Sequence, residues 1–195
     1  MKSIATSEKI IPWADSKINN LEISSDDRPR IAASCFDIAI EHQKAIILLI
    51  AKKLYGSAFA LVRLLFEAYI RGLWLNHCAN EKEIDKFKKG KIDKEFGQLI
   101  KEIENIDGYN VGVLSKAKQA GWKVLNSFTH SGFNQVVRRN TDSTIEPNYP
   151  EEEIEEAIIF TNALGLLSCL EISFLAKKND LSIEILEKMK DIKIP

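Results

Sequence analysis

Three charged residues share one stripe of an otherwise apolar stretch of sequence. Arg63, Glu67 and Arg71 are four residues apart, and this spacing places side chains on the same face of an α-helix. A guanidinium group binds phosphate or carboxylate through its planar fork, and here two guanidinium groups accompany a single carboxylate. The stripe therefore predicts a small anion-binding site, in which Arg63 contacts the ligand and Glu67 and Arg71 are candidate catalytic residues.

The same stripe has a purely structural interpretation. Glu67 would then sit between the two arginines as an ion-pair ladder along one helix, and no ligand would be needed. Desolvated ionisable groups also cluster at functional sites, so both interpretations stay open at this point. Trp74 follows the stripe on the same helix and is a further candidate ligand contact.

Two of the three histidines are candidates for proton transfer, which suits an imidazole near neutral pH. His77 follows the charged stripe, and His130 lies where the helical pattern ends, before Ser131-Gly132. We expect Gly132 to take the left-handed position that ends this helix. His42 lies on an apolar helix face, so we interpret it as a core residue.

The sequence predicts no metal site and no cofactor. His77 and Cys78 are adjacent, so on a helix their side chains point about 100° apart and are poor ligands for one ion. The sequence also lacks a glycine-rich phosphate loop, a G-x-S-x-G elbow, an HExxH pair and an EF-hand loop.

A polar segment from about residue 133 to residue 150 is predicted to be a long loop. It contains Arg138, Arg139 and Asn140, three candidate ligand-binding residues. Loops of this length in a compact domain tend to be functional or mobile. Gln135-Val136-Val137 could form a brief strand within it, although no partner strand is evident.

The elements that must position these residues are helical. Apolar residues recur at intervals of three and four through most of the chain. This pattern predicts an all-α, single-domain bundle over 1–195 with five to seven helices and the long polar loop before the last long helix. An N-terminal helix over 1–25 could pack loosely on a core bundle over 26–195. The stretches with a helical pattern are residues 7–21, 30–55, 57–79, 81–89, 93–106, 114–130 and 150–178, with a short final one from 180 to 190.

Composition limits the classes of function. The 195 residues are 45% hydrophobic and carry 27 basic and 28 acidic side chains, a net charge of −1. This balance excludes a disordered chain and argues against a general polyanion binder. The three cysteines, an odd number at wide spacing, do not indicate a disulfide framework. No apolar signal core follows the N-terminus, and the apolar run over 58–75 is interrupted by charges, so we expect a cytoplasmic protein without a membrane segment.

Two long motifs resemble a family of uncharacterised bacterial helical proteins. They are Leu61–Leu75, with the sequence LVRLLFEAYIRGLWL, and Thr129–Asn140, with the sequence THSGFNQVVRRN. The similarity continues through Glu146-Pro147-Asn148-Tyr149 into the last long helix. The family carries no established activity, so this resemblance implies the fold alone.

A more distant resemblance is to the HEPN superfamily of small helical proteins, many of which are RNA-cleaving toxins or defence effectors. Their motif is an arginine, four to six residues, and a histidine; here five residues separate Arg71 from His77, and Gly72 replaces the small polar residue that commonly follows the arginine. This resemblance implies a metal-independent ribonuclease that acts as a homodimer on RNA. On a regular helix the two side chains would point about 120° apart, so they could meet only through a helix break near Gly72 or across a dimer.

Three hypotheses follow from the sequence. The first is a non-catalytic helical module that binds an anionic small molecule or a partner through the stripe and the His130–Arg139 segment. The second is the HEPN-like ribonuclease. The third is a structural or regulatory dimer in which the stripe is only architectural. The distance between His130 and the Arg63/Glu67/Arg71 stripe would best discriminate between a site and mere packing.

Overall fold

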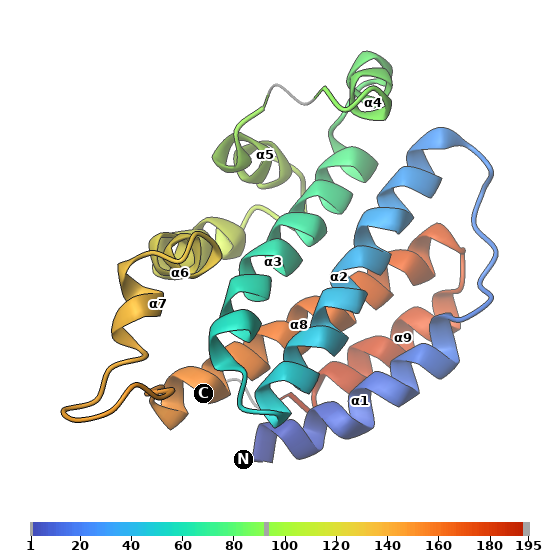
Figure 1. Ribbon diagram of the computed structural model, residues 1–195. Helices are drawn as coiled ribbons and strands as arrows, with labels where there is room; N and C mark the ends of the chain where they lie inside the picture. The colour runs from blue at the N-terminus through green and yellow to red at the C-terminus, as the bar shows by residue number, and fades with distance from the viewer. Residues whose placement is uncertain (1, 92–93, 193–195) are drawn as a thin grey trace.

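The computed structural model describes residues 2–91 and 94–192 and is all-α (Figure 1). Nine helices lie within these ranges: α1 (Lys2–Ile18), α2 (Asp27–Ala51), α3 (Tyr55–His77), α4 (Glu81–Lys88), α5 (Phe96–Ile103), α6 (Val113–Thr129), α7 (Phe133–Val137), α8 (Glu151–Leu175) and α9 (Asn179–Met189). The predicted fold class is confirmed, whereas the predicted count of five to seven helices is too low. Asp93, where one helix was expected to begin, lies outside the described residues.

Helices α2, α3 and α8 form the centre of the bundle. Helix α8 is apolar on nearly every side, and its residues Leu166 and Cys169 are fully buried, as is typical of a central helix. Helices α2 and α3 approach closely at Gly72, because the ring of Phe36 occupies the space that a side chain would need: a Cβ at Gly72 would lie 2.5 Å from Phe36 Cε1.

Helix α8 is also long and apolar enough to cross a membrane by composition alone. In the most apolar 18-residue window of this helix, 67% of the residues are buried inside the bundle. Burial of this kind is what a core helix requires, so the apolar sequence of α8 is accounted for by packing.

Helices α1 and α9 lie along α8 on the side of the bundle away from α5 and α6 (Figure 1). Ile10 and Ala14 of α1 are buried, and α1 continues through Pro12. Asn162 of α8 connects the layers, because its amide donates to Ser7 Oγ of α1 at 2.8 Å and its carbonyl accepts from Gln43 of α2 at 3.2 Å.

Helices α5 and α6 cover the other side of α3, and α4 follows at the C-terminal end of α3 (Figure 1). A capping box begins α4, with the Asn80 side chain accepting from the Glu83 backbone N–H and the Glu83 carboxylate accepting from the Asn80 N–H. Helices α5 and α6 pack against α3 and against each other. The α3–α6 contact positions the candidate site.

The segment before α8 is more structured than the sequence indicated. Gln135-Val136-Val137 belongs to α7 and not to a strand, so the strand interpretation is wrong and the loop begins only after Val137. Within the loop, Asn140 and Ile145 form an isolated antiparallel bridge. The Glu146 N–H donates to the Arg139 carbonyl and the Asn148 N–H donates to the Arg138 carbonyl, which folds 138–148 back on itself as a hairpin.

The end of α6 also differs from the expectation. Ser131, with φ of +50°, takes the left-handed position, and Gly132 has φ of −78°. Gly132 is required for space instead, because a Cβ there would lie 2.7 Å from Ser127 Oγ and 3.1 Å from the Ser127 carbonyl oxygen. The Gly132 N–H donates to that carbonyl at 2.7 Å, which fixes the turn that follows His130.

Candidate functional site

Arg63 joins helix α3 to helix α6. Its Nε donates to Glu67 Oε1 at 2.9 Å, and its Nη1 donates to Asn126 Oδ1 of α6. The same Nη1 lies 3.2 Å from His130 Nε2. We call the residues that meet here (Arg63, Glu67, Arg71, Trp122, Asn126 and His130) the Arg63 cluster.

The three charged residues of α3 form the ladder that their spacing allows. Glu67 accepts from Arg63 through one oxygen and from Arg71 Nη2 through the other, at 2.9 and 3.4 Å. The side chains of Arg63 and Glu67 are 18% and 16% exposed, whereas that of Arg71 is 42% exposed. Most donors of Arg63 are therefore used inside the protein, and Arg71 keeps most of its own for solvent or a ligand.

The contact with Arg63 constrains the protonation of His130. A guanidinium group has no acceptor, so in this contact His130 Nε2 must be unprotonated and accept the hydrogen bond. The proton of the neutral imidazole is then on Nδ1, and His130 is exposed at the end of α6. The site thus presents an N–H donor beside Arg63, while its fixed charges, two arginines and one glutamate, sum to +1.

Helix α6 meets the stripe of α3 with a stripe of its own. Trp122, Asn126 and His130 are also four residues apart, so they share one face of α6. The Arg63 guanidinium carbon lies 4.7 Å from the centre of the Trp122 ring, in the geometry of a cation–π contact. Sequence reasoning missed Trp122 and Asn126, although their spacing back from His130 is a signal that could have found them.

Trp74 and His77 do not join the Arg63 cluster. The buried indole of Trp74 donates to Glu102 Oε2 at 2.7 Å, and Lys94 Nζ lies 4.8 Å from the centre of the indole ring. His77 Nε2 lies 3.2 Å from Glu171 Oε2 of α8. Helix α3 runs unbroken through Gly72, so within one chain Arg71 and His77 point about 120° apart.

A second polar cluster surrounds His77. The Glu171 side chain is only 4% exposed and accepts a hydrogen bond from the Tyr109 hydroxyl at 2.6 Å. Burial, and then the adjacent Glu171 carboxylate, raises the pKa of the Tyr109 phenol well above its usual value. Sequence reasoning missed both residues, but a lone acid in the apolar run Leu170-Glu171-Ile172 is the same kind of signal that drew attention to Glu67.

The arginines of the loop have different surroundings. The Arg138 guanidinium forms an ion pair with Glu153 in the first turn of α8, which ties the hairpin to that helix. Arg139 is exposed. Asn140 holds the bridge to Ile145, and its carbonyl accepts from the Asn148 side chain at 3.4 Å. Arg138 and Asn140 thus make structural contacts, and Arg139 is the loop arginine whose charge is most open to solvent.

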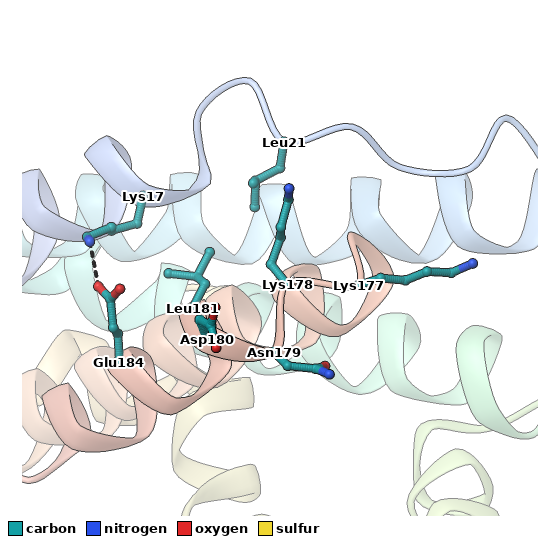
Figure 2. A pocket seen from close by; sticks show the side chains of 8 residues that line it. All are labelled: Lys17, Leu21, Lys177, Lys178, Asn179, Asp180, Leu181 and Glu184. Carbon is teal, nitrogen blue, oxygen red and sulfur yellow. Dashed lines mark ion pairs between the residues drawn. The ribbon is translucent and has the colours of Figure 1, made fainter.

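Other parts of the described chain are weaker candidates. A hollow of about 570 Å³ lies between α1 and the start of α9 (Figure 2). Figure 2 shows Lys17 directed at Glu184, with which it forms an ion pair, and Lys177 directed away from the hollow. With Asp180 also lining it, this hollow has no clear preference for an anion. Over the described residues, no group of three or more His, Cys, Asp or Glu side chains could hold a metal ion.

The fold and the cluster define a class of protein: an all-α bundle whose central helix carries a partly buried Arg–Glu–Arg ladder. Residues 36–193 match the model of a family of unknown function, DUF6988. The chain belongs to this family. No curated protein and no solved structure matches the chain.

Proposed function

We propose that this protein is a helical binding module that recognises a small anionic ligand at the Arg63 cluster. Arg71 and His130 would donate hydrogen bonds to the ligand, and Glu67 would hold both arginines in place. Arg63 would act mainly by positioning His130, because most of its donors are already bonded within the protein. Arg139 of the neighbouring loop would add positive charge without a fixed contact.

One observation carries this proposal: the 3.2 Å contact between Arg63 Nη1 and His130 Nε2. It brings the charged stripe of α3 together with the histidine at the end of α6, which are 67 residues apart in the sequence. An architectural ladder needs only Arg63, Glu67 and Arg71. The exposed imidazole of His130 lies against that ladder as well, and this supports a binding role beyond a structural one.

Charge supports the same conclusion. With His130 neutral, the cluster has a charge of +1, and most of this excess lies at the half-exposed Arg71. A bound anion would neutralise it and could accept from Arg71 and from Nδ1–H of His130. Charge-assisted hydrogen bonds of this kind are about twice as strong as neutral ones.

The alternative, a metal-independent ribonuclease built on Arg71 and His77, has less support. Each side chain already has an acidic partner, Glu67 for Arg71 and Glu171 for His77. The two point in different directions on an unbroken helix. A composite site would therefore need a second chain to supply one of the two residues.

The proposal is tested by thermal denaturation with a panel of anions: inorganic phosphate, sulfate, citrate and a nucleoside monophosphate. At least one anion should raise the melting temperature in a saturable way. Arg71→Gln should remove this rise, and Arg30→Gln should not, because Arg30 is an exposed arginine of α2 outside the cluster. Equal responses of the two variants, or no saturable rise with any anion, would contradict the proposal.

A further inference from the structure

A groove lies between α5 and α6, the two helices that cover one side of α3. It encloses about 730 Å³, within the size range of small-molecule sites. Its lining comes from both helices: Glu95, Gly97, Gln98, Ile100, Lys101, Ser115, Lys118, Gln119, Trp122 and Lys123. Trp122 is also part of the Arg63 cluster.

The groove is strongly cationic for a protein with a net charge of −1. Lys101, Lys118 and Lys123 line it against one acid, Glu95. Among the described residues none of these three lysines has an ion-pair partner. Helix α6 contains no acidic residue from Val113 to Thr129, so nothing on this helix offsets its lysines. The Gln119 amide adds further hydrogen-bond donors, whereas the Gln98 amide already donates to Glu102 Oε1 at 3.3 Å.

Lys118 is held in an electrostatically unfavourable place. Its Nζ lies 2.6 Å from the position that a Cβ on Gly97 would occupy, so the ammonium rests on the first turn of α5. The amino end of a helix carries partial positive charge. An ammonium placed there, without an acidic partner in the described structure, gains stability when an anion binds beside it.

Trp122 limits what the groove can recognise. Phe96 stacks on its ring at 4.2 Å between centroids and 9° between planes. Arg63 lies over the ring as well, and because a parallel ring already covers one face, Arg63 must cover the other. The indole therefore cannot stack on a nucleobase, and recognition in the groove must come from charge and hydrogen bonding.

We propose that this groove binds the phosphate groups of a small phosphorylated molecule, with the ammonium groups of Lys101, Lys118 and Lys123 as phosphate contacts. Lysines act as point charges toward phosphate, and three of them suit a ligand with several negative charges. Trp122 borders both this groove and the Arg63 cluster, but the three lysines are not part of that cluster. The proposal does not depend on the function proposed for the Arg63 cluster.

The test is isothermal titration calorimetry of the full chain with pyrophosphate, at low and at physiological salt. In the Arg71→Gln variant, which lacks the anion contact proposed for the Arg63 cluster, the groove should bind one pyrophosphate saturably, and more weakly at the higher salt concentration. Lys118→Gln should weaken binding about tenfold or more, the effect of losing one charge-assisted hydrogen bond. Lys116→Gln is the matched control, because it removes the same charge from the same helix outside the groove lining.

Gly97→Ala supplies a variant that keeps every charge. The new Cβ would displace the Lys118 ammonium, so pyrophosphate should bind several-fold more weakly without a change in net charge. Arg71→Gln should leave pyrophosphate binding in the groove intact, which separates this proposal from the previous one. Absence of saturable binding, an equal loss in Lys116→Gln and Lys118→Gln, or tighter binding of citrate than of pyrophosphate would overturn the proposal.

Discussion

Arg63 donates a hydrogen bond to His130 across the contact between α3 and α6, with 3.2 Å between Nη1 and Nε2. This bond fixes an imidazole at the end of one helix against a charged stripe on another. It also determines which ring nitrogen of the neutral histidine carries the proton, because Nε2 faces a guanidinium group, which can donate a hydrogen bond but cannot accept one.

Replacing Glu67 by glutamine should destabilise the protein. The change leaves two guanidinium groups beside a neutral amide, one of them largely buried. Full burial would make this loss larger; at the observed exposure we expect about 1–3 kcal/mol in the free energy of unfolding, measured by urea denaturation. Glu156→Gln is the control, because Glu156 is exposed in α8. A loss of unfolding free energy in Glu67→Gln no larger than that in the control would mean that the ion pairs of Glu67 do not stabilise the fold.

Gly72→Ala should destabilise the bundle through overpacking. Its Cβ would lie 2.5 Å from Phe36 Cε1 in the core, and forced repacking costs about 1–3 kcal/mol. The double variant Gly72→Ala with Phe36→Leu should lose less than the sum of the two single losses, because the smaller side chain makes room. Additive losses in chemical denaturation would contradict the assigned role of Gly72.

The two residues after His130 should respond in opposite ways. Ser131→Gly should stabilise the protein by roughly 0.5–1 kcal/mol, because glycine adopts the left-handed conformation without strain. Gly132→Ala should destabilise it, because the added Cβ would contact the Ser127 side chain and carbonyl. Thermal denaturation measures both effects. A lower melting temperature for Ser131→Gly and a higher one for Gly132→Ala would contradict the assigned backbone conformation of this turn.

Much of this architecture can be predicted from sequence, and the reasons for the exceptions are physical. The spacing of Arg63, Glu67 and Arg71 was sufficient to predict their shared face, because helix geometry is local. The partners Trp122 and Asn126 depend on how α6 crosses α3, which no local pattern encodes. Where the short helix α7 lies, the sequence predicts a loop with a possible brief strand, because valine favours strands. The structure instead closes a helical turn, in which the Gln135 and Val136 N–H groups donate to the Gly132 carbonyl.

Tyr109 should govern part of the alkaline stability. Its pKa is higher in the folded protein than the ordinary value of 10, so its contribution is fully present below pH 10 and is lost as the pH rises above that value. Tyr109→Phe should therefore be less stable at neutral pH by about 1–3 kcal/mol, because Glu171 loses a hydrogen bond while buried. It should also lose stability less steeply above pH 10. If the free energies of unfolding of the wild type and Tyr109→Phe fell in parallel above pH 10, the assigned role of Tyr109 would be contradicted.

The central claim, an anion site at the Arg63 cluster, is tested most directly by the imidazole nitrogen resonances of His130 during a titration with inorganic phosphate. His130→Ala identifies these resonances among those of the three histidines. The free protein should show the neutral ring protonated at Nδ1, and phosphate should shift both nitrogens saturably in the wild type but not in Arg71→Gln. Two results would contradict the proposed anion site: a neutral His130 ring protonated at Nε2 in the free protein, or His130 nitrogen chemical shifts that do not change when phosphate is added.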